Sequence, residues 1–127
     1  MRSRAVRQAA ERRGRWAETA AALYLRAKGY RICARRFKTP RGEIDIVAQR
    51  GGVLATIEVK ARPSPGEGVA AVTQHGRRRL IDAAGLFCAR FPELAALNLR
   101  FDVIAVTPFR WPRHIRQAFG HESRLQK

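Results

Sequence analysis

Three charged side chains interrupt two apolar, β-branched stretches of this chain. Asp45 lies within residues 42–47 (Gly-Glu-Ile-Asp-Ile-Val), and Glu58 and Lys60 lie within residues 57–60 (Ile-Glu-Val-Lys). Because side chains alternate between the two faces of a strand, Glu58 and Lys60 point the same way, roughly 7 Å apart. If the two stretches are neighbouring strands, one sheet face carries all three charges. This grouping suits a magnesium-dependent phosphodiesterase, because Mg²⁺ binds carboxylates and activates water.

Carboxylates are scarce in this chain, which has only ten Asp and Glu residues. Even so, Glu18, Asp45, Glu58 and Asp102 all lie in apolar or Ala-rich segments. Burying a carboxylate costs several kcal/mol unless it is paired or bound to a metal. For Asp102 we favour a structural pairing with a basic residue over catalysis. For Glu18 two interpretations stay open: it faces protein or a narrow cleft, or it is solvated and paired with an arginine.

The composition is typical of a single domain, and the cysteines do not form a cluster that could bind a metal. The chain has 127 residues, 46% of them hydrophobic, and no apolar run of the roughly 20 residues that span a membrane. Cys33 and Cys88 are isolated, and the three histidines, His75, His114 and His121, show no ligand spacing and are expected at the surface. No apolar segment follows the basic N-terminus, so we expect a cytoplasmic protein.

The charge of the chain predicts a polyanionic partner. Lys and Arg number 26 against 10 Asp and Glu, which gives a formal net charge of +16. Such an excess favours nucleic acid, DNA first, before a membrane. The candidates for contact with DNA are Arg41, Arg62, Arg77, Arg78 and Arg79. For each arginine of the run at 77–79, a solvated basic helix face is the alternative.

The hydrophobic pattern predicts a helix, a three-stranded meander, a second helix and a further strand. The expected bounds are a flexible basic arm at 1–13, a helix at 14–29, strands at 30–37, 43–48 and 53–60, an irregular loop at 62–68, a helix at 73–90 with Thr73 as its N-cap, a strand at 99–107, a short edge strand at 115–119 and a frayed tail at 120–127. The domain itself is expected to cover residues 14–119.

This order of elements, with Asp45, Glu58 and Lys60 placed as described, resembles the restriction-endonuclease-like PD-(D/E)xK nucleases. A narrower resemblance, to the bacterial YraN family, covers about residues 14–119. It is carried by Gly14-x-x-Ala17-Glu18, Tyr24-Leu25, Gly29-Tyr30, Gly42-Glu43-Ile44-Asp45-Ile46-Val47, Glu58-Val59-Lys60-x-Arg62, Ala71-Val72-Thr73 and Arg100-Phe101-Asp102-Val103. That family is related in fold to archaeal Holliday-junction resolvases.

The resemblance implies an α/β fold with an α-β-β-β-α-β core, in which helices flank a mixed central sheet. It makes Asp45 and Glu58 the ligands of Mg²⁺ or Mn²⁺, Lys60 the residue that orients water or neutralises charge, and Glu18 a supplementary acid. One departure concerns the second helix, where the family usually shows Lys-Gln and this chain has Gly76-Arg77.

Three functions remain open at this point. The first is a metal-dependent endonuclease that cuts DNA, with branched or damaged DNA as its substrate. The second is a non-catalytic nucleic-acid-binding protein with a nuclease-like fold, in which the three charges form a structural network. The third is a basic adaptor for an acidic protein. Cutting both strands of a junction would require a two-fold homodimer.

Overall fold

The structure, a computed structural model, describes residues 3–62 and 74–117. Its elements in chain order are α1 (Arg4–Ala27), β1 (Arg31–Thr39), β2 (Gly42–Arg50), β3 (Val53–Ala61), α2 (Gln74–Arg90), α3 (Pro92–Ala95), β4 (Asn98–Val106) and β5 (Arg113–Ile115). This order confirms the predicted α/β fold and is compatible with a nuclease-like core. The four longer strands begin and end within two residues of their predicted bounds.

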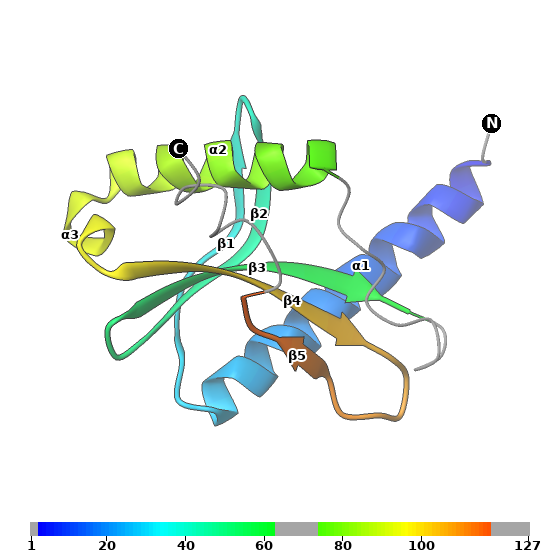
Figure 1. Cartoon of the computed structure of the whole chain (residues 1–127). Coiled ribbons are helices and arrows are strands. Elements are labelled where there is room, and N and C mark those ends of the chain that lie inside the picture. Colours follow the sequence, from blue (N-terminus) through cyan, green and yellow to red (C-terminus); the bar gives the residue numbers. More distant parts are fainter. Residues whose placement is uncertain (1–2, 63–73, 118–127) are drawn as a thin grey trace.

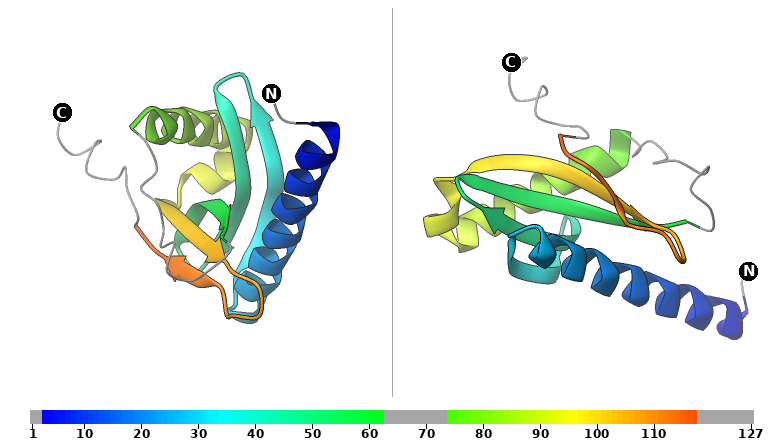
Figure 2. Two further views of the ribbon diagram at one scale, coloured as in Figure 1. Left: turned by 90° about the vertical axis from the view of Figure 1, so that its right-hand side faces the viewer. Right: turned by 90° about the horizontal axis from the view of Figure 1, so that it is seen from below.

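One mixed sheet forms the centre of the molecule, with the strand order β1-β2-β3-β4-β5 (Figure 1). Strands β1, β2 and β3 form an antiparallel meander, β3 and β4 run parallel, and β5 is antiparallel to β4. Because parallel neighbours require a crossover connection, α2 and α3 lie between β3 and β4 in the chain. Helix α1 lies against one face of the sheet and α2 against the other (Figure 2).

Each helix covers its own apolar core. The α1 core contains Ala17, Ala21, Ala22, Leu25, Tyr30, Ile46, Ala48, Ala55, Ile57, Ile104 and Val106. The α2 core contains Ile44, Val47, Leu54, Leu80, Ala83, Ala84, Phe87, Phe101 and Val103. Strands β3 and β4 supply residues to both cores, because successive side chains of a strand point to opposite faces. Both strands therefore lie inside the protein, as the apolar sequence of β4 predicts.

Helix α1 begins at Arg4 and not at residue 14, where the sequence placed its start. Ser3 is its N-cap, and the Val6 amide donates a 3.1 Å hydrogen bond to the Ser3 hydroxyl. The residues before Gly14 are mostly Arg, Ala, Gln and Glu, which favour a helix, and a single exposed glycine does not end it. Residues 4–13 are thus helical, in place of the expected arm, and this end of α1 projects past the sheet (Figure 2).

Strand β2 changes the faces of its side chains at Asp45. Residues two apart in a regular strand share a face, yet Ile46 packs in the α1 core and Ile44 in the α2 core. The β2–β3 ladder ends here, with Ile46 opposite Ile57, while β1 continues alongside β2. Beyond this point the β1–β2 hairpin leaves β3 and rises past α2 (Figure 1).

Several expectations fall outside the described residues: the loop at 63–68, the Thr73 cap, and the tail at 120–127. The predicted edge strand at 115–119 corresponds to β5 at Arg113–Ile115. Among the helices that the structure describes, none has the length and apolar character needed to cross a bilayer.

Candidate functional site

Glu58 and Lys60 lie on the same side of β3, as the period of the strand predicts. Lys60 Nζ is 2.9 Å from Glu58 Oε2, and the two side chains are 27% and 21% exposed. Between them, Val59 packs against the α1 core, so the charged pair faces the α2 side of the sheet. Helix α2 packs mainly over β2 and β1, which leaves the pair accessible to solvent.

Asp45 is held against the backbone of this Glu-x-Lys segment. Its Oδ2 accepts a 2.8 Å hydrogen bond from the amide of Val59, the residue between Glu58 and Lys60. This contact is possible because the β2–β3 ladder ends at the pair of Ile46 and Ile57. The Val59 amide therefore has no carbonyl partner in β2. The divergence of the two strands therefore positions the carboxylate beside the charged pair.

Asp45 is also surrounded by negative charge. Burial raises the pKa of Asp45 to about 7, although the hydrogen bond from the Val59 amide favours the charged form. The carboxylates of Glu58, Glu18 and Glu43 repel its negative charge and add to the rise. A concentration of carboxylates in a chain of net charge +16 is a local departure from the electrostatics of the whole molecule. A bound cation would relieve this repulsion.

Glu18 combines the two interpretations that the sequence left open. It is only 6% exposed and faces protein, and it is also paired with arginines. Arg35 Nε lies 3.0 Å from Oε1, and Arg36 Nε lies 3.1 Å from Oε2. Consecutive strand residues normally point to opposite faces, but Arg36 has a φ of 52°, which breaks the alternation and lets both side chains reach one carboxylate.

A pocket of about 500 Å³ lies between α1 and the β1–β2 hairpin. It is lined by Gly14, Arg15, Glu18, Arg36, Lys38, Glu43, Asp45 and Val59. Asp45 thus borders this pocket on the α1 side, while Glu58 and Lys60 lie on the α2 side of the sheet. The three charges therefore do not share the one sheet face that the alternation of side chains predicted, and Asp45 contacts the Glu58–Lys60 segment through the Val59 amide.

The residues present fit a magnesium ion better than a transition metal. Within residues 3–62 and 74–117, no group of three or more His, Cys, Asp or Glu side chains is arranged to hold a metal. Mg²⁺ does not need such a group, because it usually keeps several waters and takes one or two protein carboxylates together with substrate phosphates. Glu58 is close enough to Asp45 to repel its charge, and this repulsion favours a cation near the two carboxylates.

Comparison with known proteins places the chain in a family. The model of the uncharacterised protein family UPF0102 matches residues 17–106. The chain belongs to UPF0102. It is 50% identical to a UPF0102 protein of Chelativorans sp. (strain BNC1), over 93% of this chain and 95% of that protein. It is 53% identical to one of Rhodopseudomonas palustris (strain BisA53), over 89% of this chain and 87% of that protein.

UPF0102 membership confirms the resemblance to the YraN family. The matched range, 17–106, contains Glu18, Asp45, Glu58 and Lys60. It ends before β5 and the loop that precedes it, so the match covers the core of the fold and the candidate site.

The basic residues chosen from the sequence divide into two groups. Gly42, next to Arg41, lies at the tip of the hairpin against α2, where a Cβ would be 3.5 Å from the Cβ of Arg79. The fold therefore brings Arg41 to the exposed arginine run at 77–79. Arg62 lies instead at the end of β3, where its amide donates a hydrogen bond to the Val106 carbonyl.

The sequence did not identify four charged residues that line the pocket of this UPF0102 protein, namely Arg15, Arg36, Lys38 and Glu43. Glu43 could have been found, because it stands two residues before Asp45 in a chain with only ten acidic residues. Arg36 could not, because its position depends on the left-handed backbone of β1.

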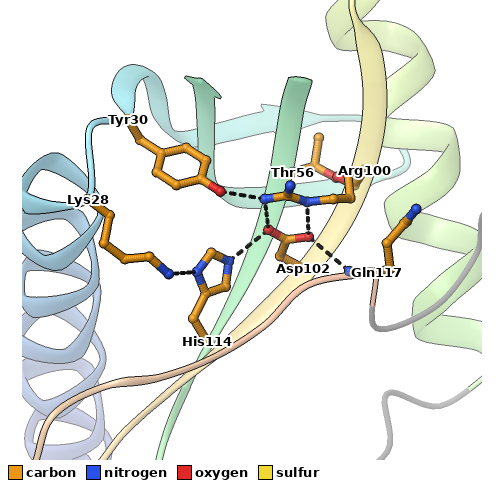
Figure 3. Close-up of polar contacts among 7 residues, drawn as sticks. All are labelled: Lys28, Tyr30, Thr56, Arg100, Asp102, His114 and Gln117. Atoms are coloured by element: carbon orange, nitrogen blue, oxygen red, sulfur yellow. Dashed lines mark hydrogen bonds and ion pairs between the residues drawn. The ribbon is translucent and has the colours of Figure 1, made fainter. Parts of the chain in front are cut away.

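A second buried carboxylate, Asp102, joins β4 to β5 (Figure 3). Its pairing with basic residues confirms the structural role predicted for it: Arg100 donates two hydrogen bonds, of 2.9 and 2.8 Å, and His114 Nε2 lies 2.8 Å from Oδ2. Burial by itself would raise the pKa of Asp102, but the hydrogen bonds from His114 and Arg100 outweigh it and hold the pKa below its ordinary value.

The expectation that His114 is a surface residue is wrong. Its side chain is only 2% exposed, and its second ring nitrogen, Nδ1, is 2.7 Å from Lys28 Nζ at the end of α1 (Figure 3). The histidine is buried because β5 lies along β4 with His114 opposite Ile104, a residue of the α1 core. Nothing in the local sequence indicates this pairing.

Proposed function

We propose that this protein is a metal-dependent endonuclease that hydrolyses phosphodiester bonds in DNA, and that it acts on branched or damaged DNA. The observation that carries the proposal is the position of Asp45, whose carboxylate is fixed to the backbone between Glu58 and Lys60 and is repelled by three other acids. A structural role alone does not require this repulsion. A cation site does require it, because the repulsion between the carboxylates gives the site its affinity for a cation.

Asp45 and Glu58 would hold Mg²⁺ or Mn²⁺, which when bound withdraws charge from the phosphoryl group and acidifies a water molecule. Lys60 is a compact charge paired with Glu58 at 2.9 Å, and it can orient the attacking water or neutralise charge on the phosphoryl oxygens. Glu18 is already held by Arg35 and Arg36. We assign it the supporting roles of placing Arg36 in the pocket and adding negative charge beside Asp45.

DNA is the partner that the charge favours. The chain carries a net charge of +16, and the arginines at 41 and 77–79 gather where the hairpin tip meets α2. A DNA substrate would place the protein in the cytoplasm, where reduced cysteines such as Cys33 and Cys88 are ordinary. Cleavage of two strands at a junction would need two sites, which a two-fold homodimer on the DNA would provide.

One observation favours a second candidate, a nucleic-acid-binding protein without catalysis. Each acid of the site already has a partner within the protein: Asp45 the Val59 amide, Glu58 the Lys60 ammonium, and Glu18 the two arginines of β1. Such a network could serve to fix the three strands. It does not by itself explain why Glu18, Glu43 and Glu58 lie close enough to Asp45 to repel its charge, which is why we place it second.

A cleavage assay separates the two candidates. Purified protein is mixed with supercoiled, linear and branched DNA and with RNA, in Mg²⁺, in Mn²⁺ or in EDTA. We expect cutting of DNA that requires the metal and falls on the order of 10³-fold in Asp45→Asn and in Lys60→Ala, because several kcal/mol of transition-state stabilisation are lost.

Asp82→Asn, an exposed change on α2 away from the site, is the matched control and should leave the rate unchanged. Tight binding of DNA without cutting in either metal would reject the endonuclease and support the second candidate. Failure to bind any nucleic acid, with capture of an acidic protein, would support an adaptor.

A further inference from the structure

The loop between β4 and β5 presents two aromatic side chains to solvent. Phe109 is 105% exposed and Trp111 is 87% exposed. Among the described residues, the other exposed large apolar side chains, Val6, Trp16, Leu23 and Leu86, lie on helices and are 41–58% exposed. Aromatic rings in a soluble fold normally bury most of their surface, and two adjacent exposed rings mark a site of interaction.

The backbone holds Phe109 in this exposed position. The Arg110 amide donates a 3.3 Å hydrogen bond to the Thr107 carbonyl, which closes a four-residue turn with Pro108 second and Phe109 third. The φ of Phe109 is 61°. Proline fixes the second residue near −65°, so this is a type II turn, whose third position is suited to glycine or asparagine. An aromatic residue here is strained, and such strain is typical of functional positions.

The loop lies at the end of the sheet where the Glu58–Lys60 segment ends (Figure 1). Lys60 pairs with Ala105 in the parallel register, and Ala105 pairs with Arg113 in the antiparallel register. Because neighbouring strands are about 4.8 Å apart, Lys60 and Arg113 are about 10 Å apart across the sheet and point to the same face. The loop at 107–112 directly precedes Arg113 in the chain and therefore lies next to the candidate site.

The loop alternates aromatic rings with positive charge. Arg110 stands between Phe109 and Trp111, Arg113 follows, and both arginines are exposed. Aromatic rings stack on nucleic-acid bases whatever their identity, while guanidinium groups contact the backbone phosphates. A pairing of rings and arginines therefore fits a nucleic acid with accessible bases better than it fits a neutral apolar partner.

We propose that Phe109 and Trp111 form a stacking platform for unpaired bases, and that the protein therefore prefers branched, flapped or gapped DNA to continuous duplex. In a continuous duplex the faces of the bases are covered by their neighbours, whereas at a branch point they are accessible. This inference rests on the contact with DNA in the proposed function, but it is independent of cleavage.

The test measures binding in EDTA, by fluorescence anisotropy, to a forked DNA and to a duplex of equal length. We expect the double variant Phe109→Ala, Trp111→Ala to lose at least about 5-fold in affinity for the fork, since stacking of one base is worth about 5- to 150-fold. Its affinity for the duplex should change by less than about 2-fold. Trp16→Ala, which removes an exposed aromatic residue from α1, is the matched control and should leave both affinities unchanged.

A second variant distinguishes a binding role from a structural one. Phe109→Gly suits the left-handed position of the turn, so its melting temperature should equal or exceed that of the wild type. Its affinity for the fork should nevertheless fall. In Trp16→Phe, the remaining tryptophan is Trp111, whose fluorescence should be quenched by the fork and not by the duplex.

Equal losses on fork and duplex, or no loss on either, would overturn the proposal. So would a loop-dependent affinity for vesicles of anionic lipid in place of DNA, or a loop-dependent change in oligomeric state. If fork binding depends on the loop but no DNA is cut in Mg²⁺ or Mn²⁺, the endonuclease fails and the stacking platform stands. If DNA is cut and the loop variants bind the fork normally, the platform alone fails.

Discussion

At the scale of single residues, Asp45 is placed where the proposed function and the stability of the fold oppose each other. Its pKa is about 7 in the folded protein against an ordinary value of 3.8, chiefly because it is buried and also because it faces other acids. Between these values the folded state binds more protons than the unfolded state. The contribution of Asp45 to stability is therefore fully present below pH 3.8 and is lost as the pH rises through 7.

We accordingly expect Asp45→Asn to stabilise the protein at pH 8 and to have little effect near pH 4. The charged form costs at most about 4 kcal/mol, and a gain of about 1–3 kcal/mol is expected because the amide oxygen of asparagine can still accept from Val59. Urea unfolding at both pH values measures the difference. A variant less stable than wild type at pH 8 would contradict the electrostatic account.

The same residue gives a test of cation binding that does not use activity. An ion that binds only the folded protein raises its free energy of unfolding. Addition of Mg²⁺ or Mn²⁺ at pH 8 should therefore raise the melting temperature of the wild type and not that of Asp45→Asn. Ca²⁺, a hard cation that also binds oxygen ligands, should stabilise the wild type without supporting cleavage. Equal shifts in both proteins would place the ion elsewhere.

At the scale of elements, side-chain hydrogen bonds and ion pairs hold β5 in place more than its backbone pairing with β4 does. It has three register pairs with β4, whereas the polar network of Figure 3 connects it to β4 and to the end of α1. Because hydrogen bonds hold the pKa of Asp102 below its ordinary value, the stability this carboxylate contributes is present above its unfolded pKa and is lost as the pH falls through the folded value. Acid should release β5 early.

We expect His114→Phe to cost about 1–3 kcal/mol, because it removes one acceptor bond of the buried Asp102 and leaves Lys28 without its partner. Arg113→Ala, on the same strand and facing the other way, should change the free energy of unfolding by less than about 0.5 kcal/mol. Urea unfolding and hydrogen exchange of the Ile115 amide provide the measurements. Equal stabilities for the two variants would show that the network contributes nothing.

At the scale of the whole molecule, the charge of +16 favours encounter with a polyanion. Binding of DNA should release counterions and weaken steeply with salt. The exposed arginines of the hairpin tip and of α2 lie together, so DNA contacts are expected to concentrate at this end of α2.

Arg78→Gln should therefore lower the slope of log K against log salt by about 0.9, the value for one phosphate contact. Arg90→Gln, at the opposite end of the same helix, is the matched control and should leave the slope unchanged. Anisotropy titrations between 50 and 200 mM salt would give both slopes. A shallow slope for the wild type would contradict contact with phosphates altogether.

The sequence determined the elements because they depend on local periodicity. Alternating apolar residues fixed β2, β3 and β4 to within two residues, and the same alternation placed Glu58 and Lys60 on one side of their strand, where they form an ion pair. The pairing of Asp102 with basic residues followed from the cost of burying a lone carboxylate. The start of α1 differs from the prediction because Gly14 does not end the helix within a segment of strong helix formers.

The tertiary structure decided what long-range contacts control. Only the divergence of β2 from β3 sets Asp45 on the Val59 amide, and only the left-handed Arg36 brings two arginines to Glu18. The burial of His114 and the exposure of Phe109 likewise depend on how β5 returns along β4. These features cannot be predicted from the sequence, because each joins segments that are distant in the chain or requires a backbone angle that its residue type does not predict.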